Sequence, residues 1–139
     1  MTSFARVIAG LLALAIGACA FLPWTPGGTA GDIPLRTLLG PDSGSGSVSW
    51  ALSMALPVVV SAGIVMVGAV GNSRTLVIIG GLTAVAVPTA WILVNAISGS
   101  DAAIAVRAVQ IGAYGAAIAG FMVLILAAMA IDTRVPSVR

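Results

Sequence analysis

The side chains best suited to bind a ligand lie near the start of the last apolar segment. Arg107, Gln110 and Tyr114 follow one another at spacings of three and four residues, which places them on one face of a helix. Asn95 and Trp91, near the end of the preceding apolar segment, are expected at the same level. The Arg107 guanidinium offers bidentate binding of a phosphate or carboxylate. We call these five residues the polar patch and predict it as the candidate binding site.

Two interpretations of the polar patch stay open. Polar groups at membrane depth are costly unless they are satisfied, so the patch either caps the helices, meets lipid headgroups or contacts a partner. Alternatively, Arg107 extends to water or phosphate and pairs with Asp101.

The sequence lacks the usual residues for catalysis and metal binding. His and Glu are absent, all six basic residues are Arg, and the four Asp lie in loops or flanks. Haem ligation by His, zinc sites and Ser-His-Asp triads are therefore excluded. Cys19 is the single cysteine, so an internal disulfide is excluded too. We predict no enzymatic activity of its own, no cofactor and no metal.

The composition indicates a membrane protein. Of 139 residues, 60% are hydrophobic and 7% are charged, and the mean hydropathy is +1.17. A soluble domain of this size needs a polar surface, so lipid is the plausible solvent for the outward face. The net charge of +2 is dispersed, which argues against nucleic-acid binding. The Arg, Ala, Gly and Val bias is typical of a GC-rich genome and suggests a bacterial plasma membrane.

The apolar segments predict one all-α membrane domain of four transmembrane helices. The expected spans are residues 7–22, 51–70, 75–97 and 111–131, with an outer loop at 24–49. No helix breaker separates Asp101 from the last span, so a single helix of about 31 residues could rise roughly 46 Å. Pro57 and Pro88 fall inside the second and third spans, where proline tends to kink a helix.

The arginines predict the orientation. Arg6, Arg74, Arg134 and Arg139 fall on one side, and Arg36 and Arg107 fall on the other with three of the Asp. Basic residues in short flanks are retained in the cytoplasm, so both termini are expected there. The aromatic residues agree, since Trp24, Trp50, Trp91 and Tyr114 all map near the outer interface.

The outer loop is rich in Pro, Gly and Ser and is expected to be mostly irregular. Within it, Asp32 is expected to cap a short turn that starts near Pro34, stops at Gly40 and lies on the outer membrane surface. That turn is either a docking element for a partner or a cover for the helix ends.

Residues 16–19 also resemble a bacterial lipoprotein signal, whose cleavage would leave an acylated Cys19 at the mature N-terminus. The alternative is that Cys19 is a small residue in a packed helix.

Small residues recur every fourth position in the first and last spans. Such stripes let helix backbones approach closely in lipid, within one chain or between chains. The two stripes are Ala9, Ala13 and Gly17, and Gly112, Ala116 and Gly120.

The short first span ending in Phe21-Leu22-Pro23-Trp24, followed by a Gly-rich outer loop and three further spans, resembles small four-helix actinobacterial membrane proteins of unknown function. This resemblance implies the layout and assigns no residue a role. Small four-helix multidrug exporters are also similar in size, but they depend on a membrane-embedded Glu that this chain lacks.

Two functions follow as expectations. The first is a non-catalytic accessory or scaffold subunit that packs in a bacterial membrane complex. The second is a small-molecule or lipid-binding membrane protein, or a transporter component, whose site is the polar patch. The expected partners are membrane lipids and other membrane protein subunits or further copies of the chain.

Overall fold

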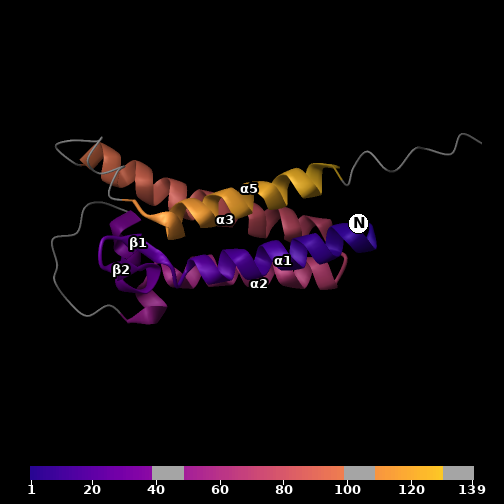
Figure 1. Ribbon diagram of the computed structural model, residues 1–139, viewed down its shortest axis with the longest axis horizontal. Coiled ribbons are helices and arrows are strands. Elements are labelled where there is room, and N and C mark those ends of the chain that lie inside the picture. The colour runs from indigo at the N-terminus through magenta and orange to yellow at the C-terminus, as the bar shows by residue number, and fades with distance from the viewer. Residues whose placement is uncertain (39–48, 99–108, 130–139) are drawn as a thin grey trace, which may run out of the picture.

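The computed structural model describes residues 1–38, 49–98 and 109–129, and this part of the chain is almost entirely helical (Figure 1). Its helices are α1 (Ser3–Cys19), α2 (Ala55–Val70), α3 (Arg74–Ser98) and α5 (Ile111–Met129). A short antiparallel hairpin, β1 (Pro23–Thr25) and β2 (Gly28–Thr29), follows α1.

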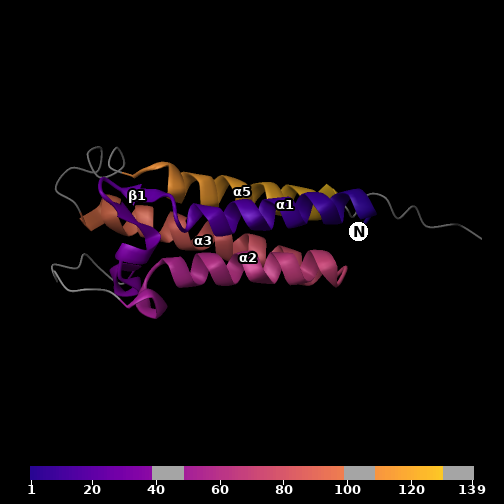
Figure 2. The same cartoon turned by 60° about the horizontal axis from the view of Figure 1, so that its bottom comes forward.

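The four helices form a bundle in which each helix has two neighbours. α1 packs against α2 and α5, and α3 packs against the same two helices from the other side (Figures 1 and 2). The buried core therefore runs along the bundle axis and is shared by all four helices.

Small residues occupy the contacts between helices. Ala9 and Ala13 of α1 are buried, and Gly17 lies against α2, where an added Cβ would be 3.6 Å from Ala62 Cβ. Ala116 of α5 is fully buried, and a Cβ on Gly120 would be 2.9 Å from Ala84 Cβ of α3. Both stripes thus lie inside the bundle, where they bring the backbones close together.

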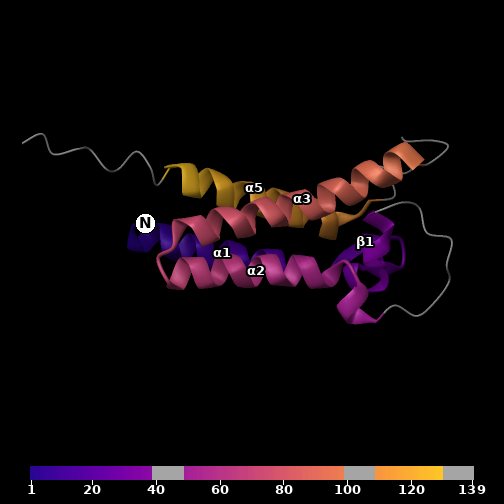
Figure 3. The same cartoon turned by 180° about the vertical axis from the view of Figure 1, so that it is seen from behind.

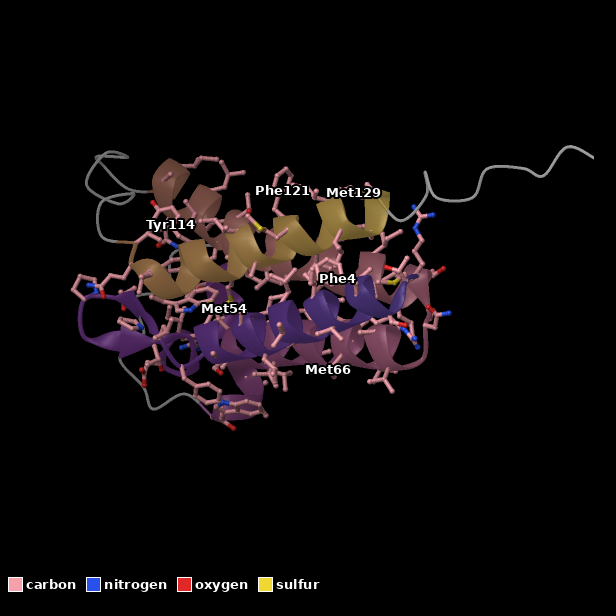
Figure 4. All side chains as sticks on the ribbon, turned by 45° about the vertical axis from the view of Figure 1, so that its right-hand side comes forward. Phe4, Met54, Met66, Tyr114, Phe121 and Met129 are labelled. Carbon is pink, nitrogen blue, oxygen red and sulfur yellow. The ribbon has the colours of Figure 1, made fainter. Side chains whose placement is uncertain are left out.

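The outward faces of the helices carry large apolar side chains. Figure 4 shows Phe121 and Met129 on the outer side of α5, and Phe4 of α1 is 75% exposed. Among the described residues, α3 and α5 are the helices long and apolar enough to cross a membrane, and α1 and α2 are shorter apolar helices.

α1 begins and ends earlier than the predicted span 7–22, and α2 begins later than predicted but ends at Val70 as expected. α1 starts at Ser3 rather than residue 7, because Thr2 Oγ1 caps it by accepting the Ala5 N–H at 3.2 Å, and a charged Arg6 does not interrupt a helix. α2 starts at Ala55 rather than residue 51, since the 3-10 turn η3 (Trp50–Leu52) precedes it. Pro57 therefore lies in the first turn of α2, where its missing N–H costs no helical hydrogen bond.

The last helix was predicted to continue upstream of residue 111, and this is wrong for the two residues before it. Val109 and Gln110 are not helical, and α5 begins at Ile111. The Gln110 backbone N–H instead donates to the Trp24 carbonyl at 3.0 Å, which takes the chain out of the helical path.

The turn between α2 and α3 is three residues long and closes α2 with a left-handed cap. Asn72 has a φ of 53°, which asparagine tolerates better than most residues. The Ser73 N–H then donates to the Gly68 carbonyl at 2.8 Å, as in a Schellman motif. α2 and α3 are thereby held as a tight antiparallel hairpin.

Pro88 lies inside α3 and is fully buried. Its ring removes one helical hydrogen bond, which favours a bend. Figure 3 shows α3 following α2 and then diverging from the bundle axis toward its C-terminal end. The bend that proline was expected to cause is therefore present in α3.

The described part of the outer loop is more ordered than predicted. After the hairpin come two 3-10 turns, η1 (Ala30–Asp32) and η2 (Leu35–Leu38). Ile33 is buried, its carbonyl accepts the Met54 N–H at 2.9 Å, and Pro34 forms an isolated bridge with Ser53. These contacts hold the loop against the start of α2.

Asp32 was predicted to cap the turn that starts near Pro34, and this prediction is wrong. Asp32 Oδ2 accepts from the Thr29 N–H at 2.8 Å and from Thr29 Oγ1 at 2.9 Å, so it closes the turn η1 and not the turn after Pro34. The η2 turn is present, but Leu35 and Leu38 are half-buried and pack against the core, which differs from a turn lying free on a membrane surface. Gly40 lies outside the described residues.

Candidate functional site

Trp24 organises one end of the bundle. It is fully buried, and its indole Nε1–H donates to the Cys19 carbonyl at 2.8 Å, one of the last carbonyls of α1. Its ring lies 5.8 Å from that of Trp91, tilted by 56°, a favourable geometry for an aromatic pair. We call the end formed by Trp24, Trp91 and Gln110 the tryptophan end.

The structure brings together part of the predicted polar patch, with Trp91 buried and Asn95 and Gln110 half-buried. Trp91 is buried against Trp24, and the Gln110 backbone is bonded to Trp24. The Asn95 side-chain amide donates to the Trp91 carbonyl at 2.8 Å, within α3 itself. These three residues therefore stabilise the tryptophan end.

Gln110 and Tyr114 do not lie on one continuous helix. Gln110 precedes α5, and Tyr114 is a helical residue with 39% of its surface exposed (Figure 4). Arg107, and Asp101 with which it was expected to pair, lie outside the described residues. The spacing argument fails here because it assumed a helix through Gln110.

The expected belt of outer aromatic rings is only partly formed. Trp50 is 47% exposed and Tyr114 is exposed, but Trp24 and Trp91 are core residues. Their indole rings pack inside the bundle and do not lie at a membrane interface, so these two residues are weak indicators of membrane depth.

A groove between α1 and α2 lies at the opposite end of the bundle, with a volume of about 300 Å³. Arg6 and Ser3 supply its polar groups, and the rest of its lining is apolar. The lining consists of Ser3, Arg6, Val7, Gly10, Met66, Ala69 and Val70. We call it the α1–α2 groove, and Figure 4 shows Met66 on the α2 side.

Two arginines give this end of the bundle its charge. Arg6 lies in the first turn of α1, and Arg74 begins α3. The Met1 amino group donates to Asn72 Oδ1 at 3.1 Å, which ties the start of α1 to the turn before Arg74. We call the end formed by Arg6, Asn72 and Arg74 the arginine end.

Neither guanidinium is fully satisfied by the described part of the protein. Arg6 Nη2 donates to Ser3 Oγ at 3.2 Å, but Arg6 Nε is buried and has no hydrogen-bond partner among the described residues. Arg74 Nε is also buried and has no hydrogen-bond partner among the described residues. Buried polar groups normally have partners, so these two Nε–H groups are unusual within the described residues.

This groove was not predicted, because Arg6 was used only to predict the orientation in the membrane. A signal was available, since Ser3, Arg6, Val7 and Gly10 recur at spacings of three and four and so share a helical face. The partner face on α2, which includes Met66, could not be read from sequence without knowing which helices are neighbours.

Cys19 is a buried core residue at the end of α1, and an added Cβ on Gly115 of α5 would be 2.9 Å from its Sγ. Residues 3–19 form a full helix of the bundle. This packing supports the interpretation of Cys19 as a small residue between helices.

Within the described ranges, no group of three or more His, Cys, Asp or Glu side chains is placed to hold a metal ion. The chain matches no protein-family model, and comparisons with curated proteins and with solved structures find no match either. The likeness to small actinobacterial membrane proteins therefore stays a prediction.

Proposed function

We propose that this chain is a four-span protein of a bacterial plasma membrane that serves as a non-catalytic accessory or scaffold subunit. The observation that carries the proposal is the distribution of apolar residues, which is the reverse of that in a soluble protein. Small residues fill its interior, whereas Leu11, Leu14, Ile118 and Phe121 stand exposed on its outside. Burial of that apolar surface in lipid or against another membrane protein is strongly favourable.

The packing supports four spans although α1 and α2 are short. At 1.5 Å per residue, 17 and 16 residues rise about 26 and 24 Å, slightly less than a hydrocarbon core of about 30 Å. Both helices lie alongside α3 and α5, which are long enough to cross (Figure 1). Exposed apolar residues next to their ends, such as Phe21 and Leu52, extend the apolar surface.

The charges support an orientation with the arginine end in the cytoplasm. Arg6 and Arg74 lie at that end, while Arg36 lies at the tryptophan end beside the acidic Asp32 region. Arginines in short flanks favour retention on the cytoplasmic side.

The outward face of α2 is a plausible contact surface for a partner. Val60 and Val67 are exposed, and an added Cβ on Gly63 between them would meet no atom within 4 Å. This face is therefore flat, and a flat face allows a partner helix to approach closely.

The test is a comparison of Gly63→Leu with Ala86→Leu, which places the same side chain at an exposed position of α3. Both variants should keep the stability of the isolated chain in mild detergent, because both positions face outward. If α2 packs against a partner, Gly63→Leu should abolish stoichiometric co-purification and Ala86→Leu should not. A wild-type chain that purifies alone from its native membrane would contradict the scaffold function.

A further inference from the structure

We infer that the α1–α2 groove binds an anionic phospholipid of the cytoplasmic leaflet, with its phosphate at Arg6 and part of an acyl chain along Gly10 and Met66. This inference rests on the proposed placement of the bundle in a membrane. It adds a defined site, a ligand class and a leaflet to that proposal.

The order of chemical groups along the groove matches that of a lipid. Ser3 and Arg6 lie at the start of α1, and Val7 and Gly10 follow toward the middle of the bundle. From Ser3 to Gly10 the helix rises about 10 Å at 1.5 Å per residue. Polar groups thus lie at the membrane surface and apolar ones below them, in the order of a headgroup followed by an acyl chain.

The groove has the shape to accept a chain. Gly10 has no side chain to fill the groove, and an added Cβ would be in ordinary contact with Met66 Sδ, at 3.8 Å. Met66 is half-buried and flexible, and its thioether adapts to irregular apolar ligands. A volume of about 300 Å³ holds part of one acyl chain rather than a whole lipid.

The charge at the arginine end calls for an anion from outside the described residues. Within residues 1–38, 49–98 and 109–129 the one carboxylate side chain is that of Asp32, which belongs to the tryptophan end. Arg6 and Arg74 each keep a buried Nε without a partner. Basic pockets between helices on the cytoplasmic side are suited to anionic headgroups, because a phosphate satisfies several N–H groups at once.

The experiment uses the full chain reconstituted into vesicles of phosphatidylcholine and phosphatidylglycerol, followed by extraction and native mass spectrometry. Wild type should retain phosphatidylglycerol in preference to phosphatidylcholine. Arg6→Gln should reduce that preference by about tenfold, the scale of a lost charge-assisted hydrogen bond. Arg36→Gln is the matched control, since it removes the same charge at the tryptophan end, and it should change nothing.

Two further arms separate the parts of the inference. Gly10→Leu should fill the groove and reduce lipid retention without changing the charge, whereas Gly63→Leu on the outward face of α2 should not. Inorganic phosphate added at millimolar concentration should fail to displace the lipid. Displacement by phosphate, equal retention by Gly10→Leu, or equal losses in Arg6→Gln and Arg36→Gln would each overturn the inference.

Flotation of the vesicles keeps the two proposals distinguishable. All variants should float with the vesicles, because none removes apolar surface. A chain that does not float would contradict the membrane placement, whereas floating chains with no preference for phosphatidylglycerol would contradict only the lipid site.

Discussion

The two ends of the bundle differ in whether their polar groups have hydrogen-bond partners. At the tryptophan end, the Trp24 indole, the Trp24 carbonyl and the Asn95 amide all have partners inside the protein. At the arginine end, Arg6 and Arg74 keep buried N–H groups without partners in the described structure. The tryptophan end therefore holds the fold together by internal hydrogen bonds, whereas the arginine end is where we propose the lipid site.

The largest expected effect comes from removing the centre of the tryptophan end. Trp24→Ala leaves a cavity and an unpaired Cys19 carbonyl, and we expect it to lower the free energy of unfolding in detergent by about 3–5 kcal/mol. Trp50→Ala is the control, because Trp50 is half exposed, and it should change stability by less than about 0.5 kcal/mol. Equal losses would show that Trp24 is not a structural centre.

A smaller effect is expected where α5 approaches Trp24. A Cβ on Gly112 would lie 2.7 Å from Trp24 Nε1 and 2.8 Å from the Pro23 carbonyl oxygen. Gly112→Ala should therefore cost about 1–3 kcal/mol, the range for overpacking. Gly63→Ala meets no neighbour and should stabilise α2 by about 0.5–1 kcal/mol, since alanine is the better helix former. Thermal unfolding of both variants checks the pair, and a neutral Gly112→Ala would contradict the close approach.

Much of the helical layout was predictable because long apolar segments have few other solutions. The α3 helix, at Arg74–Ser98, extends the predicted span 75–97 by one residue at each end. The start of α5 was not predictable, because no residue before Ile111 breaks a helix and the cause is a contact with Trp24, 86 positions earlier than Gln110. The helix assumed through Gln110 was wrong for the same reason, so the polar patch stays an untested prediction. The α1–α2 groove was missed because it needs two helices.

The smallest effect concerns the turn at Asp32, whose pKa is lowered by hydrogen bonds from the Thr29 N–H and hydroxyl. The carboxylate is favoured in the folded state, so its contribution is complete above its ordinary pKa of 3.8 and is lost as the pH falls through the lower folded value. We expect the protection factor of the Thr29 amide, which is its exchange relative to an unprotected amide at the same pH, to fall under acid conditions and in Asp32→Asn. The Met54 amide, bonded to Ile33, should keep its protection and serves as the control. Unchanged exchange at Thr29 would contradict this role.

The placement of the arginine end in the cytoplasm is the central claim, and cysteine labelling tests it most directly. In a Cys19→Ala background, single cysteines replace Ser73, in the turn beside Arg74, and Ser45, in the outer loop. Intact cells are treated with a membrane-impermeant thiol reagent, and permeabilised cells show that both sites are reactive. The account predicts labelling at Ser45→Cys and none at Ser73→Cys before permeabilisation, whereas labelling at Ser73→Cys without labelling at Ser45→Cys would contradict it.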